Sequence, residues 1–226
     1  MNRNTCKTAV FVVAGVLLLQ TAALAGPPLV CHPFNIGDAR SLPFQGPEWS
    51  RIDPNYDVTN LVKDTMSLLG NDVPVIVRME TLRRATVYSR NDAKLAAALL
   101  ESLRNRAEKS ASTGQGHDAV MASFDLAYLA ETYRQAGLAS RASSEASWKF
   151  AHTAPAADGY AIIQRLIEQG GGPEMEFAAA LITSDKRNSD YFDHLRKASA
   201  GAKPGSLLAK NLASHFPDDM RSARLQ

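Results

Sequence analysis

The chain has 226 residues, of which 45% are hydrophobic and 21% charged, and its formal net charge is +2. This composition is typical of a globular protein with a sizeable core, and it excludes a low-complexity or collagen-like chain. Because the whole sequence has only two cysteines, it also excludes a disulfide-dense miniprotein.

Residues 1–25 have the pattern of a secretory signal peptide. The start is basic, an apolar run covers residues 9–19, and the segment ends in Ala23-Leu24-Ala25, a small-residue cleavage site. We predict cleavage before Gly26 and not an uncleaved anchor, because the apolar run is shorter than the ~20 residues of a bilayer span. The mature protein is then expected to be periplasmic or extracellular, with no stable membrane span.

Cleavage would balance the charge of the mature chain. It removes two of the 25 basic residues, Arg3 and Lys7, and none of the 23 acidic ones. Binding to a nucleic-acid backbone needs clustered lysine and arginine, so we expect no nucleic-acid partner. The short runs Arg83-Arg84 and Lys186-Arg187 are interpreted as solvated helix faces.

Cleavage would also remove Cys6 and leave Cys31 as the single thiol, which excludes an internal disulfide. The pair Cys31-His32 has the residue types of a soft-metal ligand set or a redox thiol. The competing interpretation is a buried, apolar thiol beside a surface histidine. We favour the second, because adjacent residues in an extended segment point to opposite sides.

Residues 26–56 hold six of the eleven prolines and show no helical periodicity. Proline fixes its own φ and pushes the preceding residue toward extended geometry. We therefore predict an extended, proline-rich arm, which Phe34, Phe44 and Trp49 would anchor against the rest of the protein.

Residues 57–226 are predicted to form a domain of successive helices. Capping residues, helix-stopping glycines and apolar residues at helical spacing indicate where the helices lie. The expected helices cover 57–70, 74–88, 92–109, 118–136, 139–152, 158–169, 173–184, 189–200 and 204–215. No strand-like alternation competes with them, so the predicted fold class is all-α.

Three glycines in the C-terminal half repeat at an interval of 34 residues: Gly137, Gly171 and Gly205. Each lies between two of the expected helices. Helical hairpins repeated at this period are typical of an α-solenoid. The sequence therefore predicts antiparallel hairpins stacked side by side.

The first hairpin resembles a tetratricopeptide repeat over about residues 123–156, and the resemblance continues more loosely to 215. The matching positions are large, large, small, aromatic, glycine and small: Leu126, Leu129, Ala130, Tyr133, Gly137 and Ala142. Ala146 and Lys149 depart from the pattern. The resemblance implies a groove that binds a peptide or protein segment. It also implies that Glu131, Arg134 and Gln135 face that groove.

Motifs for enzymatic chemistry are missing from the sequence. There is no phosphate-binding loop, His-Glu-x-x-His, Gly-x-Ser-x-Gly or Cys-x-x-Cys. Asp190, Asp193 and His194 share a helix face, but acidic residues in a first turn also stabilise the helix dipole. We predict no metal site and no cofactor, and we favour a non-catalytic protein. An enzyme whose site is assembled from dispersed residues is the third possibility.

The leading hypothesis is an exported, non-catalytic module that binds a peptide or protein segment, or acts as a scaffold, in the cell envelope. Stacked helical hairpins form extended concave surfaces that suit such partners. The alternative is a periplasmic metal-handling or thiol-redox protein that uses Cys31 and His32.

Overall fold

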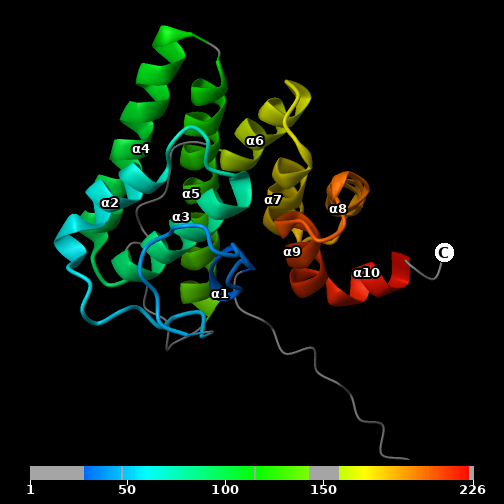
Figure 1. Ribbon diagram of the computed structural model, residues 1–226, viewed down its shortest axis with the longest axis horizontal. Helices are drawn as coiled ribbons and strands as arrows, with labels where there is room; N and C mark the ends of the chain where they lie inside the picture. The colour runs from blue at the N-terminus through cyan, green and yellow to red at the C-terminus, as the bar shows by residue number, and fades with distance from the viewer. Residues whose placement is uncertain (1–27, 47, 115, 143–157, 224–226) are drawn as a thin grey trace, which may run out of the picture.

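The structure, a computed structural model, describes residues 28–46, 48–114, 116–142 and 158–223. These residues form ten α-helices and one 3₁₀ helix and contain no β-strand (Figure 1). The predicted all-α fold class is confirmed. The predicted signal peptide, and the part of the expected helix 139–152 beyond residue 142, lie outside the described residues.

Most helices lie where the sequence predicts them. The 3₁₀ helix η1 (Val58–Asn60) leads into α2 (Leu61–Leu68), and the next helices are α3 (Val75–Ser89), α4 (Ala93–Thr113), α5 (His117–Ala142), α6 (Gly159–Glu168), α7 (Pro173–Thr183), α8 (Ser189–Gly201) and α9 (Leu207–His215). The short helices α1 (Pro28–Cys31) and α10 (Pro217–Ala223) were not expected. Side-chain caps fix several helix starts: Asp92, Asp158 and Ser206 each accept a backbone N–H of the first turn.

The turn predicted at Gly137 is wrong, because α5 continues through this residue to Ala142. A single glycine costs a helix only about 1 kcal/mol relative to alanine. The long buried side of α5, which includes Tyr133 and Ala136, outweighs that cost. Gly171 and Gly205 do lie between helices, and Gly205 has a φ of +76° that suits glycine.

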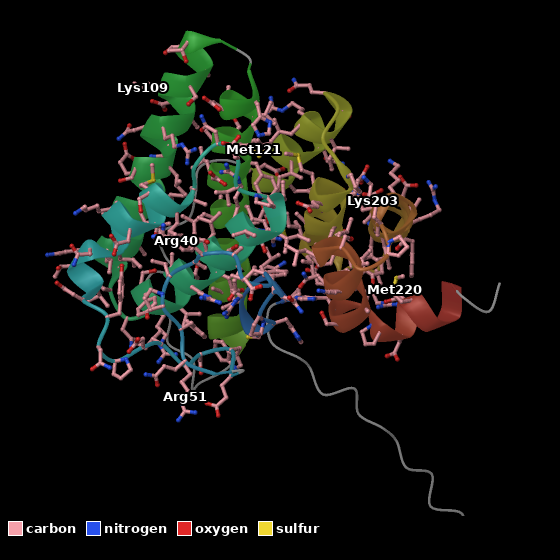
Figure 2. All side chains as sticks on the ribbon, viewed as in Figure 1. Arg40, Arg51, Lys109, Met121, Lys203 and Met220 are labelled. Atoms are coloured by element: carbon pink, nitrogen blue, oxygen red, sulfur yellow. The ribbon has the colours of Figure 1, made fainter. Side chains whose placement is uncertain are left out.

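Successive helices pack against each other: α4 on α5, α5 on α6, α6 on α7, and α7 on α8 (Figure 1). Side chains fill the space between these helices (Figure 2). The helix α3 contacts α2, α4, α5 and α7 and lies at the centre. Thirteen of its 15 residues are buried, so α3 has no face open to solvent.

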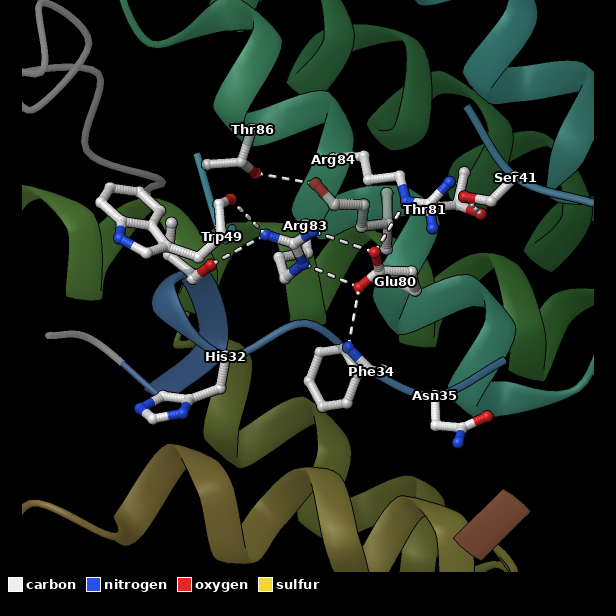
Figure 3. A network of polar contacts seen from close by, with 12 residues as sticks. His32, Phe34, Asn35, Ser41, Trp49, Glu80, Thr81, Arg83, Arg84 and Thr86 are labelled. Atoms are coloured by element: carbon white, nitrogen blue, oxygen red, sulfur yellow. Dashed lines mark hydrogen bonds and ion pairs between the residues drawn. The ribbon is translucent and has the colours of Figure 1, made fainter. Parts of the chain in front are cut away.

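Because α3 is enclosed on all sides, it carries charged side chains into the core. Arg83 donates from Nε to Glu80 Oε2 at 2.7 Å and from Nη2 to Oε1 at 2.9 Å. Arg84 Nε donates to the same Glu80 Oε1 at 2.7 Å (Figure 3). Arg83 and Glu80 are buried and Arg84 is mostly covered. The interpretation of Arg83-Arg84 as a solvated face is therefore wrong.

The same charged cluster holds the proline-rich segment against α3. Arg83 Nη1 donates to the carbonyl oxygens of Val30 at 3.1 Å and Trp49 at 2.8 Å. The backbone N–H of Phe34 donates to Glu80 Oε2 at 3.0 Å (Figure 3). These bonds satisfy backbone groups of a segment that has no regular secondary structure after α1, apart from one isolated bridge.

Apolar side chains cover this cluster. The guanidinium groups of Arg83 and Arg84 lie 4.9 and 5.5 Å from the centre of the Phe44 ring, which is within cation–π range. Phe34 is buried, and Phe44 and Trp49 pack against the core. The three aromatic residues that the sequence suggests as anchors thus all contact the body of the protein.

A second buried ion pair joins α3, α4 and α5. Arg78 Nη1 lies 2.7 Å from Asp125 Oδ2, and Arg106 Nη1 lies 3.2 Å from the same oxygen. Arg78 also donates to the carbonyl oxygens of Gly70 and Val73, so it closes the turn that follows α2. Burial raises the pKa of the Asp125 carboxyl to about 6, although both guanidinium groups oppose this rise.

Replacing Glu80 tests how far the fold depends on the buried cluster. We expect Glu80→Gln to lower the free energy of unfolding by about 3–5 kcal/mol, because it leaves the buried Arg83 without a counter-charge. Urea denaturation measures this loss. The control is Glu101→Gln, which breaks the exposed pair with Arg104 on α4 and should cost at most about 1 kcal/mol. Equal losses in the two variants would contradict the role given to Glu80.

Candidate functional site

The binding residues implied by the tetratricopeptide resemblance lie on α5, and two of them are buried and hydrogen-bonded within the protein. Glu131 is buried; it accepts the Tyr160 N–H at 3.2 Å and the Arg134 Nε–H at 2.6 Å. Gln135 is also buried; its Oε1 accepts the Leu29 N–H at 3.1 Å. These contacts hold α6 and α1 on α5. Only Arg134, with a side chain 40% exposed, is open to solvent.

The contact between α5 and α6 is unusually close at Gly159. A Cβ atom at this position would lie 2.4 Å from the Ala127 carbonyl oxygen and 2.8 Å from Glu131 Cγ. Glycine is therefore required for the start of α6 to reach Glu131. This close approach explains why the Glu131 side chain is enclosed between α5 and the start of α6.

Cys31 ends α1 and is partly buried. Burial raises the pKa of its thiol to about 11, and the nearby charge of Arg83 opposes the rise only in part. A thiol with this pKa has very little thiolate at neutral pH, and the thiolate is the form that attacks electrophiles and binds metals. The raised pKa thus favours an unreactive thiol over a redox or metal-binding one.

The acidic and histidine side chains on α8 do not gather around a common point. His194 Nδ1 lies 2.5 Å from Glu176 Oε2, and its Nε2 lies 2.9 Å from the Tyr160 hydroxyl. Asp193 pairs instead with Lys197 and Arg196. Within the described ranges, no three His, Cys, Asp or Glu side chains lie close enough together to hold a metal ion.

A cleft of about 600 Å³ lies where the start of the described chain meets its last helices. Pro28 and His32 line it from the N-terminal side, Leu181 comes from α7, and Phe216 and Pro217 come from the junction of α9 and α10. Its volume falls within the range of about 300–1,000 Å³ usual for ligand-binding sites. His32, one residue of the predicted Cys31-His32 pair, belongs to this cleft, whereas Cys31 does not line it.

One wall of the cleft is an ordered group of polar and aromatic side chains. Arg187 donates from Nη2 to Asp219 Oδ1 at 2.6 Å, and the Tyr191 hydroxyl donates to Asp219 Oδ2 at 2.7 Å. The side chain of Asp219 is only 17% exposed. Asp219 is therefore mostly covered, whereas the Arg187 side chain is 56% exposed, so its interpretation as a solvated residue holds. The placement of Lys186-Arg187 on a helix face is wrong, because both residues lie between α7 and α8.

Arg187 also has an unusual backbone. Its φ of +43° makes it the one non-glycine residue with positive φ in the described part of the chain. Such a conformation costs about 1–3 kcal/mol and persists only when surrounding contacts hold it. Here the Asp219 carboxylate and the faces of Tyr191 and Phe192 hold the guanidinium, with 5.1 and 5.5 Å to the two ring centres.

Two imidazole rings also line the cleft. The centres of His32 and His215 lie 6.0 Å apart, and His215 stacks on Phe34 with 4.7 Å between ring centres. Burial lowers the pKa of both histidines. At neutral pH they are therefore uncharged groups that offer hydrogen bonds and flat apolar faces.

No motif in the sequence marks Tyr191, His215, Phe216 and Asp219 as cleft residues. They come from α8, the end of α9, the residue that follows it and α10, and they meet only through tertiary packing. A tyrosine or histidine at helical spacing has no feature that separates it from an ordinary core residue.

No protein-family model matches this chain, and neither the curated proteins nor the solved structures offer a match to it. The fold and the cleft define its class: an all-α protein of packed helix pairs with a cleft between α1, α7, α8 and α10. Among the helices described, none is long and apolar enough to cross a bilayer.

The raised pKa of Cys31 gives a direct chemical test. In a Cys6→Ser background, we expect iodoacetamide at pH 8 to alkylate Cys31 about 100-fold more slowly in the folded protein than in urea, because a pKa two units higher reduces the thiolate by that factor. Mass spectrometry follows the reaction. A folded-state rate within a few-fold of the unfolded rate would show a reactive thiol and would favour the redox hypothesis.

Proposed function

We propose that the protein is an exported, non-catalytic module of the cell envelope that binds a peptide or a protein segment in the cleft. The observation that carries this proposal is the cleft of about 600 Å³, with apolar residues such as Leu181 and Phe216 beside a polar rim. Binding sites for small ligands and peptides commonly combine such surfaces. Export is proposed from the composition of residues 1–25.

The hydrogen bonding in the cleft supports binding over catalysis. The Ser184 hydroxyl donates to the Leu181 carbonyl oxygen at 2.9 Å, and the Tyr191 hydroxyl donates to Asp219. Neither hydroxyl has a histidine as its partner, as a nucleophile activated by a general base would. The Asp219 carboxylate is in turn occupied by Arg187. These groups are arranged to hold the shape of the cleft.

The helix arrangement supports the same proposal. The packed helices α6, α7, α8 and α9, with glycine turns at Gly171 and Gly205, are compatible with a helical-repeat protein. Repeats of this kind present concave surfaces to extended partners. Kinship with tetratricopeptide repeats is part of this proposal, although the continuous α5 lacks the turn that such a unit needs at Gly137.

A cleft-filling variant tests the proposal. Fluorescent peptides are first selected from a random library for binding to the purified protein. Their affinity is then measured by anisotropy for the unaltered protein and for Ser184→Tyr, which places a ring in the cleft from the end of α7. We expect their affinity to fall more than about tenfold, because a bulky side chain in the cleft excludes the ligand.

The matched control is Ser102→Tyr on α4. Ser102 bonds the carbonyl oxygen four residues before it, much as Ser184 bonds Leu181, but it lies outside the cleft. Its variant should bind the peptides as the unaltered protein does. Failure to select any peptide, or equal affinity of the Ser184→Tyr variant, would count against the proposed function.

A further inference from the structure

The cleft has an excess of negative charge. Among the described residues, three carboxylates line it, from Asp185, Asp218 and Asp219, against the one guanidinium of Arg187. His32 and His215 add no charge at neutral pH, because burial lowers the pKa of both. Since the predicted mature chain has equal numbers of acidic and basic side chains, this excess is a local property of the cleft.

Arg187, the one cation among the described residues that line the cleft, is already engaged. Arg187 forms two hydrogen bonds with Asp219, at 2.6 and 3.4 Å, and Asp219 also accepts the Tyr191 hydroxyl. An incoming anion would have to compete with this carboxylate for Arg187. Asp185, in contrast, is exposed and has no ion pair within the described residues, so its charge is available to a ligand.

An exposed aromatic residue follows Tyr191, one of the lining residues of the cleft, in the chain. Phe192 is 48% exposed, an unusual degree for a large apolar side chain, and its ring contacts Tyr191 with 4.9 Å between centres. The guanidinium of Arg187 already lies near both rings. Tyr191 itself is fully buried, so the exposed part of the Phe192 ring is the apolar surface on which the aliphatic part of a partner's side chain can pack.

We infer that the cleft recognises a peptide segment with a lysine or arginine side chain, whose charge pairs with Asp185 and whose flanking residues pack on Phe192. This inference rests on the proposed function and adds the chemistry of the partner. The negative rim disfavours the opposite class of ligand, such as an acidic peptide, by like-charge repulsion. Electrostatic complementarity of this kind sets which partner binds.

Peptides that differ at one position test the inference. A library-selected peptide is made with Lys, Arg, Gln or Glu at its most sensitive position, and each version is titrated by anisotropy. We expect Lys and Arg to bind up to about fivefold more tightly than Gln, and Glu to bind most weakly, because one exposed ion pair contributes on this scale. The preference should shrink at 1 M salt, where the Debye length is about 3 Å.

The Asp185→Asn variant identifies the residue responsible. We expect it to bind the Lys and Gln peptides almost equally, whereas Asp72→Asn, which removes an exposed carboxylate from the turn before α3, keeps the preference. Retained preference in Asp185→Asn would overturn the assignment to Asp185. Peptides that bind, and that Ser184→Tyr displaces, without any preference for a cation would overturn the inference and leave the proposed function standing. Absence of binding by every peptide would instead count against the function itself.

Discussion

The buried carboxylate of Glu80, shared between Arg83 and Arg84, is the interaction on which the rest of the structure depends. Removing these charges from water is costly, and that cost is offset only when every charge has a partner and every remaining N–H has an acceptor. The acceptors are the carbonyl oxygens of Val30, Leu42 and Trp49, all in the segment that precedes the helical body. The charged side chains of the central helix α3 therefore have all their hydrogen-bond acceptors only when that segment is in place.

The same constraint builds one wall of the cleft. With Phe34 bonded to Glu80, the Phe34 ring lies against His215, and Asn35 exchanges two hydrogen bonds of 2.8 Å with Asn211 on α9. The chain just before these contacts supplies Pro28 and His32 to the cleft. The charged cluster around Glu80 and the cleft are thus linked through the chain that carries Phe34, although no residue of the cluster lines the cleft.

Local signals in the sequence predicted the helices well, because capping side chains and turn glycines act over a few residues. These signals do not predict the burial of Arg83. Periodicity assigns an arginine to the solvent, and the two carbonyl oxygens that accept from Arg83 lie 34 and 53 residues away in the chain. The turn predicted at Gly137 is wrong for the opposite reason, because the prediction gave a single glycine more weight than the packing of the helix around it. The cleft depends on the contact between Arg187 and Asp219, 32 residues apart, which no local pattern predicts.

Hydrogen exchange at the Phe34 amide tests the central claim most directly, because this N–H has the buried Glu80 carboxylate as its acceptor and lies outside any helix. Measured by NMR, it should exchange as slowly as amides in the middle of α3, and Glu80→Gln should accelerate it far more than Glu101→Gln does. Exchange of the Phe34 amide in the unaltered protein at the rate of an exposed loop would show that the segment is not held by α3, and would contradict the account.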